Sequence, residues 1–125
     1  MDPQNIILAC EVRSVLVKKI QKRRSRSDLD NLFLMLGDVR LHLLPLLENG
    51  PLFDEIYILF PDPWWKPKHR KRRLFQPGFL PFLAKALKPD GVIILKTDVS
   101  AYRDVVEQLV RSNPIFVIDE SKLSA

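Results

Sequence analysis

The stretch that decides the fold is EIYILFPDP, residues 55–63. Its β-branched and aromatic residues predict a buried strand over residues 55–60. Pro61 and Pro63 end the strand, because proline cannot donate to a strand ladder. The same prolines restrict the backbone on both sides of Asp62, so we expect a carboxylate held at the tip of the strand.

Similar apolar runs lie at residues 5–10, 31–36 and 92–96, with a weaker one at 115–118. Helical spacing predicts helices over residues 11–24, 39–48 (perturbed by Pro45), 77–87 and 101–111 (capped by Ser100). Residues 88–91 predict a turn before the strand 92–96. Strands that are apolar throughout and alternate with helices indicate a mostly parallel sheet covered on both faces. The sequence therefore predicts an open α/β fold, with residues 1–125 forming one domain.

The composition narrows the class of protein. The net charge of +5 favours a polyanionic partner. No apolar run approaches the roughly 20 residues of a membrane helix, so we expect no membrane association. The single Cys10 excludes an internal disulfide and fits a buried thiol in a reducing compartment. No His/Cys cluster has metal-ligand spacing, so no metal site is expected.

An acid follows each of the four predicted strands: Glu11, Asp38, Asp62 and Asp98. In open α/β folds ligands bind beyond the carboxyl ends of the strands. Glu11 could accept hydrogen bonds from the ribose of an adenosine cofactor, or interact with a helix dipole. Asp38 could accept from an adenine amino group, or cap the helix that follows it. The sequence leaves both alternatives open.

Aromatic and basic residues follow Asp62 directly. Trp64 and Trp65 can stack on a base. The next cations come without an acid between them: Lys66, Lys68, His69, Arg70, Lys71, Arg72 and Arg73. This pattern predicts a phosphate-binding stripe beside a fixed carboxylate. A solvated loop and a localisation signal are the alternatives. An earlier basic cluster at residues 18–26 is expected to be a solvated helix face.

The run FPDPWWK, continued to KRR at residues 71–73, resembles the signature of the tRNA (guanine-N7)-methyltransferases. Residues 9–12 (ACEV) are similar to the Gly-Ile-Glu-Val segment of that family, and Gly37-Asp38 fits its next acid. Lys96-Thr97-Asp98 with Tyr102 resembles its Thr-Asp-x-x-x-Tyr segment. The similarity covers residues 5–113. It implies an S-adenosylmethionine-dependent enzyme with a Rossmann-like fold that methylates guanine N7 in the variable loop of tRNA, in the cytoplasm.

The resemblance also implies a role for individual residues. Glu11, Asp38 and Asp62 would bind S-adenosylmethionine, and Asp62 would be the catalytic acid of the active site. Lys66 and Asp98 would contact the substrate. The RNA-contacting residues would be Lys68, His69, Arg70, Lys71, Arg72 and Arg73. Nothing in the pattern predicts the oligomeric state.

The sequence departs from the family in two places. The family opens with a strand and a glycine-rich loop that cradles the cofactor, and the four glycines here form no such loop. Residues 114–125 contain nothing like the family's closing Thr-x-x-Glu segment. We therefore expect a fragment that lacks the first, central strand of the sheet. The family strand order 3-2-1-4-5 then pairs residues 5–10 with 31–36, and 55–60 with 92–96.

Three hypotheses follow for this fragment. The chain is the core of the methyltransferase described above, or a non-catalytic RNA-binding remnant kept for its basic loop. It could also act on exocyclic amines, where Asp-Pro-Pro-Tyr or Asp-Pro-Pro-Trp motifs occur, but Asp62-Pro63-Trp64 lacks one proline. A sheet without its central strand leaves unpaired backbone groups that each cost about 1–3 kcal/mol. We therefore expect residues 1–125 alone neither to fold cooperatively nor to bind S-adenosylmethionine measurably.

Overall fold

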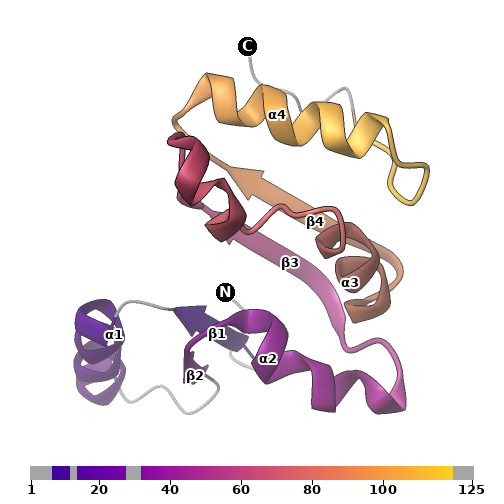
Figure 1. Cartoon of the computed structure of the whole chain (residues 1–125). Coiled ribbons are helices and arrows are strands. Elements are labelled where there is room, and N and C mark those ends of the chain that lie inside the picture. Colours follow the sequence, from indigo (N-terminus) through magenta and orange to yellow (C-terminus); the bar gives the residue numbers. More distant parts are fainter. Residues whose placement is uncertain (1–6, 12–13, 28–31, 120–125) are drawn as a thin grey trace. The chain divides into compact units, whose positions relative to one another are not determined.

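The computed structural model describes residues 7–11, 14–27 and 32–119. The chain divides into two compact units, Met1–Asn49 and Gly50–Ala125. The first unit carries the elements labelled β1 to α2, and the second carries β3 to α4 (Figure 1). The prediction that residues 1–125 form one domain stays a prediction.

The first unit is a two-stranded parallel sheet with helices. Strand β1 (Ile7–Glu11) precedes helix α1 (Ser14–Ser27), and strand β2 (Leu32–Leu36) precedes helix α2 (Val39–Leu43). Strands β1 and β2 pair in parallel from Ile7 opposite Leu32 to Glu11 opposite Leu36. The side chains of Val17 and Leu43 are buried. Cys10 in β1 is partly buried, and burial raises the pKa of its thiol, which keeps the thiol uncharged and unreactive.

The end of helix α2 shows the effect of Pro45. The helix starts at Val39 as predicted but ends at Leu43, and residues Leu44–Asn49 continue as the 3-10 helix η1. Proline lacks an amide hydrogen and its ring clashes with the carbonyl of the preceding turn, so the α-helical hydrogen bonds cannot continue. The position predicted for the helix, residues 39–48, is therefore correct, but the helix changes from α to 3-10 after Leu43.

The second unit pairs strand β3 (Phe53–Leu59) with strand β4 (Leu87–Lys96), again in parallel. Between them lie the 3-10 helix η2 (Pro67–Arg72) and helix α3 (Phe79–Ala86), and helix α4 (Ser100–Arg111) follows β4. The buried apolar side chains of this unit are Ile58, Phe79, Leu80, Leu83, Ala86, Tyr102 and Val106. Both strand pairings are the ones expected from the family strand order.

Strand β4 is longer than predicted, because the expected turn at residues 88–91 lies inside it. Phe53 pairs with Leu87 and Glu55 pairs with Val92, so β3 advances two residues while β4 advances five. The additional residues form an irregularity in which Asp90 has a φ of 65°. The turn residues therefore interrupt the ladder instead of preceding it.

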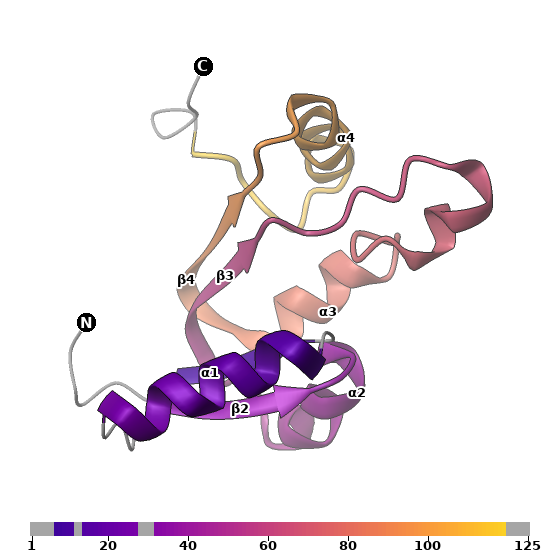
Figure 2. The same cartoon turned by 90° about the vertical axis from the view of Figure 1, so that its left-hand side faces the viewer.

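The expectation that both faces of the sheet are covered is wrong for the second unit. Figure 2 shows α3 and α4 on the same side of β3 and β4. Successive strand residues point to opposite faces. Accordingly, Ile58 is 8% exposed, whereas its neighbours Tyr57 and Leu59 are each 57% exposed. The apolar run of β3 thus buries one face and leaves the other open.

Two local expectations near the C-terminus are also wrong. Residues 115–118 form no strand, and Val117 is 96% exposed, because no neighbouring strand forms a ladder with them. Ser100 is the first residue of α4 and not its cap. The cap position is Val99, whose amide donates to Thr97 Oγ1 at 3.2 Å. The side-chain hydrogen bond of this turn thus comes from Thr97, ahead of the helix.

Candidate functional site

Asp62 and Asp98 follow the same edge of the β3–β4 sheet. Leu59, the last residue of β3, pairs with Lys96, the last residue of β4, and the Phe60 amide donates to the Lys96 carbonyl at 2.7 Å. Because the strands are parallel, the segments that begin at Pro61 and Thr97 leave from one edge. Both carboxylates are exposed there. The structure therefore confirms the predicted placement of these two acids at one sheet edge.

The turn that carries Asp62 has a strained backbone at both ends. Phe60 has a φ of 50° and Trp64 a φ of 44°, values that side-chain-bearing residues adopt rarely. Within the turn, the Trp64 amide donates to Asp62 Oδ1 at 3.2 Å. Such conformations cost about 1–3 kcal/mol each and persist only where the surroundings hold them. The position of the carboxylate thus depends on contacts made by the rest of the loop.

Each of the two tryptophans of the loop lies against a cation. The guanidinium carbon of Arg72 lies 5.3 Å from the centre of the Trp64 ring, and that of Arg73 lies 5.0 Å from the Trp65 ring. The His69 ring meets Trp64 edge-on, with 5.6 Å between ring centres. Cations at these distances are attracted to the negative face of an indole. The indoles, expected from sequence to stack on a base, therefore already contact side chains of their own loop.

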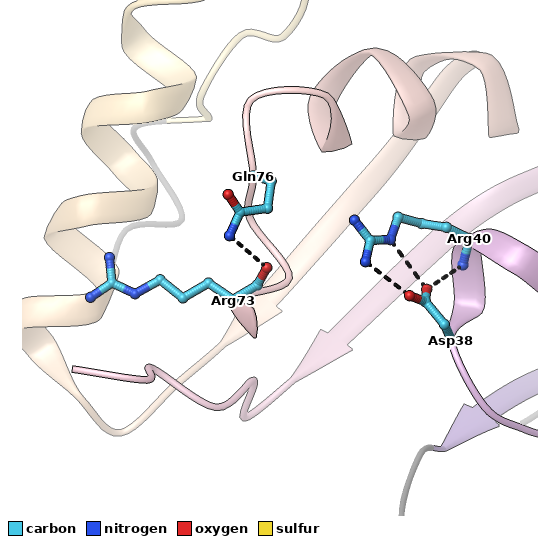
Figure 3. A network of polar contacts seen from close by, with 4 residues as sticks. All are labelled: Asp38, Arg40, Arg73 and Gln76. Carbon is cyan, nitrogen blue, oxygen red and sulfur yellow. Dashed lines mark hydrogen bonds and ion pairs between the residues drawn. The ribbon is translucent and has the colours of Figure 1, made fainter. Parts of the chain in front are cut away.

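Arg73 makes the most contacts within this loop. Its Nε–H donates to the carbonyl oxygen of Pro63 at 2.6 Å, and its guanidinium also lies 5.9 Å from the Tyr102 ring centre. Its own carbonyl accepts from Gln76 Nε2 at 3.1 Å, as Figure 3 shows, and Gln76 Nε2 also donates to the Arg70 carbonyl at 2.9 Å. Sequence patterns gave no signal for the contact between Arg73 and Pro63, because it joins residues ten positions apart through loop geometry.

The basic residues divide by exposure. The exposed ones are Lys66, Lys68, Arg70, Lys71 and Arg72, whereas His69 and Arg73 are partly buried. Helix η2 begins at Pro67, directly after its cap residue Lys66. Contact of these residues with RNA stays a prediction. Arg73 is partly buried and donates to the Pro63 carbonyl, whereas Arg72 is exposed while it lies over the Trp64 ring.

A hollow of about 460 Å³ lies at the carboxyl end of β4. Its lining residues are Phe60, Leu95, Lys96, Thr97, Asp98, Ser100 and Arg103. Asp98 therefore presents a hydrogen-bond acceptor to a space bounded on another side by an aromatic ring. Asp62 does not line this hollow. The contact of Lys66 and Asp98 with a substrate stays a prediction.

Tyr102 packs beneath the loop. Its side chain is fully buried, and its ring meets Trp65 edge-on with 6.3 Å between ring centres. Its hydroxyl has no hydrogen-bond partner of good geometry in the described part of the chain. Burial raises the pKa of the phenol; Arg73 and a long hydrogen bond with the Phe75 backbone lower this pKa, and Asp62 raises it slightly. The sequence marked Tyr102 without a role, and the structure gives it one in supporting the loop.

The first unit has its own strand-end acids. Glu11 ends β1 opposite Leu36, and its side chain lies outside the described part of the chain. Asp38 accepts from the Arg40 amide at 2.9 Å, from Arg40 Nε at 3.2 Å and from Arg40 Nη2 at 2.8 Å (Figure 3). These hydrogen bonds hold the pKa of the Asp38 carboxyl below its usual value. Asp38 thus caps α2, which is one of the two roles that the sequence left open.

Gly37 makes room for this cap. Its φ of 127° disfavours any other residue, and a Cβ there would lie 2.9 Å from His42 Nε2. His42 Nε2 lies 2.7 Å from the Leu36 carbonyl oxygen. The glycine is therefore required by the local turn, whether or not a ligand approaches it.

The edge of the first unit fits the adenosine part of S-adenosylmethionine. Parallel pairing places Glu11 and the segment Gly37-Asp38 at one sheet edge. A carboxylate has about four acceptor positions, and Arg40 occupies three of those of Asp38, so one stays available to an amino or hydroxyl group. No residues of the sequence form a glycine-rich loop for the methionine part. Binding of the cofactor by Glu11, Asp38 and Asp62 stays a prediction.

Within residues 7–11, 14–27 and 32–119, no three His, Cys, Asp or Glu side chains are placed to hold a metal ion. In the same segments, no helix has the length and apolar character to cross a membrane.

Comparison with known proteins identifies a family. A family model described as "Putative methyltransferase" matches residues 1–124. A tRNA (guanine-N(7)-)-methyltransferase of Acidovorax sp. (strain JS42) is 37% identical over 113 residues, which cover 90% of this chain and 45% of that protein. Proteins of the same name are 35% identical in Thermosynechococcus vestitus and in Nitrosomonas europaea, with 53% and 51% of their lengths covered. The chain thus spans about half the length of these relatives, and it belongs to the methyltransferase family whose model it matches along nearly its whole length.

Proposed function

We propose that this chain is the base-holding and tRNA-binding part of an S-adenosylmethionine-dependent tRNA (guanine-N7)-methyltransferase. The observation that carries the proposal is the loop after β3, where the exposed Asp62 carboxylate and an exposed basic 3-10 helix leave one strand end together. The names of the relatives agree with this chemistry. Such an enzyme acts in the cytoplasm, which fits the single cysteine.

Guanine N7 carries a lone pair at neutral pH, so the reaction needs no base to deprotonate the nucleophile. The task of the protein is therefore to position the ring in line with the methyl group. Asp62 accepts hydrogen bonds from guanine N1–H and N2–H, which orients the base and offsets the positive charge that develops on the ring. Lys66 and Asp98 contact the same nucleotide from the loop and from the end of β4.

S-adenosylmethionine, when bound, supplies a methyl group on a positively charged sulfonium sulfur. Glu11 and Asp38 would hold its adenosine part at the edge of the β1–β2 sheet, through hydrogen bonds to ribose hydroxyls and the adenine amino group. Asp62 would also contact the cofactor. No metal takes part in this scheme, because the nucleophile needs no activation.

The exposed cations of helix η2 bind the tRNA backbone. Lys68, Arg70 and Lys71 point their charges into solvent, where phosphate oxygens can replace water. Phosphate contacts fix the position of the RNA and carry no sequence information themselves. The specificity for one guanine then comes from the Asp62 turn and the hollow that Asp98 lines.

The decisive experiment uses a chimera in which this chain replaces the matching segment of the Acidovorax relative. The chimera is incubated with unmodified tRNA transcript and labelled S-adenosylmethionine, and the nucleosides are identified by mass spectrometry. We expect 7-methylguanosine. The intact relative is the positive control, and circular dichroism with thermal unfolding checks that the chimera folds.

Other outcomes would contradict the proposal. A folded chimera that binds tRNA but transfers no methyl group would make the chain an RNA-binding remnant. Methylation of an exocyclic amine would place the chain in a different class of enzyme. The 125-residue chain by itself is tested beside the chimera, and we expect neither a sharp unfolding transition nor a shift with S-adenosylmethionine. A sharp transition that the cofactor shifts upward would overturn that expectation.

A further inference from the structure

Arg73 differs from the other cations of its loop in where its charge lies. Lys68, Arg70 and Lys71 are exposed, whereas Arg73 is partly buried. Its guanidinium lies 5.0 Å from the Trp65 ring centre and 5.9 Å from the Tyr102 ring centre. A guanidinium that contacts two rings and is partly buried is poorly placed to reach a phosphate. Its charge is instead used within the protein.

The hydrogen bond of Arg73 reaches the turn that carries Asp62. Nε–H donates to the carbonyl oxygen of Pro63, the residue after Asp62, at 2.6 Å. This turn is strained, with positive φ at Phe60 and Trp64, and proline gives Pro63 no amide hydrogen for a ladder. The Arg73 side chain therefore stabilises a backbone conformation that the turn residues would not keep by themselves.

The backbone that carries the Arg73 side chain is also fixed by hydrogen bonds. Gln76 Nε2 donates to the carbonyl oxygens of Arg70 and Arg73, which closes the end of helix η2. Tyr102 is fully buried under the rings, so the guanidinium rests on a part of the core. Together these contacts connect the core, through Trp65 and Arg73, to the carbonyl that follows Asp62.

We propose that Arg73 is a positioning residue that holds the Asp62 turn in its reactive conformation, and that it is not a contact to tRNA phosphate. This inference rests on the proposed function of Asp62. Only a planar guanidinium can stack on an indole and donate Nε–H sideways at once. Lysine keeps the charge but has a single ammonium group, which cannot lie over the indole and also donate to the Pro63 carbonyl as the guanidinium does, so Arg73→Lys separates the two roles.

The test compares Arg73→Lys, Arg73→Ala and the control Arg23→Lys, at an exposed residue of α1, in the chimera described above. We expect Arg73→Lys to lower kcat by about tenfold or more, with the Kd for tRNA within about twofold and an unchanged salt dependence of binding. Arg23→Lys should leave all three quantities near those of the parent. Chymotrypsin cleavage after Trp65, followed by mass spectrometry, should accelerate in Arg73→Lys and not in Arg23→Lys.

Two results would overturn the inference. If Arg73→Lys keeps kcat while Arg73→Ala lowers the slope of log K against log salt by about one unit, Arg73 is a phosphate contact. If the loss of kcat in Arg73→Lys only follows a loss of folded protein, its role is general stability. If the parent chimera transfers no methyl group, the proposed function fails. The rate of chymotrypsin cleavage then tests the role of Arg73 by itself. Faster cleavage with an unchanged salt slope supports it, and unchanged cleavage overturns it.

Discussion

Asp38 and Asp62 both follow the carboxyl end of a parallel strand, one in each unit, yet their surroundings differ. The Asp38 carboxylate accepts three hydrogen bonds from Arg40, and helix α2 begins at the next residue, Val39. Asp62 accepts one hydrogen bond, from the Trp64 amide, and is exposed. The position at a strand end is the same, so the residues that follow the acid decide its role. Asp38 is followed directly by helix α2 and by Arg40, which occupies the carboxylate, whereas no helix begins after Asp62 until Pro67.

The largest effect is expected for Asp62→Ala in the chimera, which tests whether the exposed strand-end acid has a role that the capping acid Asp38 lacks. We expect methyl transfer to fall by about two to three orders of magnitude, as when a transition-state hydrogen-bond partner is removed, with unfolding unchanged. The matched control is Asp54→Ala, at the opposite end of the same strand, whose side chain is 83% exposed. Activity of the Asp62 variant within a few-fold of the parent would show that this carboxylate has no special role.

The second test compares the two basic regions. Replacing Lys68, Arg70 and Lys71 with alanine should weaken tRNA binding and lower the slope of log K against log salt by somewhat under one unit for each lost phosphate contact. The control replaces Lys18, Lys19 and Lys22, exposed residues of α1. Titrations at several salt concentrations decide the result. Equal losses in both triple variants would mean that only the overall charge matters.

The third test concerns the Asp38 cap. Asp38→Ala should destabilise the chimera by about 0.5–1 kcal/mol, the low end for a lost cap because the partly exposed ion pair is screened by solvent. Asp38→Asn keeps a capping oxygen and should lose less. The measurement is thermal unfolding of both variants beside the parent. Equal destabilisation by alanine and asparagine would assign the effect to the ion pair with Arg40.

The pH dependence of the cap follows from the lowered pKa of Asp38. The folded-state pKa lies below the unfolded value of about 3.9, so the contribution is complete above pH 3.9 and is lost as the pH falls through the folded-state pKa. Thermal unfolding of the parent and of Asp38→Asn between neutral and strongly acidic pH should therefore converge at the acidic end. A difference that persists at the lowest pH would rule out titration of this carboxyl as the cause.

The smallest effect is expected for Tyr102→Phe. The buried hydroxyl has no partner of good geometry, so its removal should change stability by less than about 0.5 kcal/mol and leave methyl transfer unchanged. Unfolding and activity of this variant are measured beside the parent chimera. A clear loss of activity would mean that the phenol hydroxyl takes part in holding Asp62 or the guanine.

The local pattern was sufficient for most of the elements. The apolar runs found β1, β2 and β3 to within two residues at the ends that the structure describes, and the helical spacing found the cores of α1, α3 and α4. It failed where a partner decides the outcome. The run at residues 115–118 has β-prone residues but no ladder, and residues 88–91 look like a turn but extend a strand.

The sequence by itself determined the parallel α/β class, the strand-end position of Asp62 and Asp98, and the family, because these depend on residue order and local periodicity. Only the tertiary structure decided which basic side chains of the loop face solvent and which bind other groups of the protein. Arg70 and Arg73 belong to one basic run, yet one faces solvent and the other donates to the Pro63 carbonyl beneath Trp65. The reason is physical: a guanidinium finds its partner through the folding of the loop, and residues ten positions apart carry no shared periodicity that would reveal the contact.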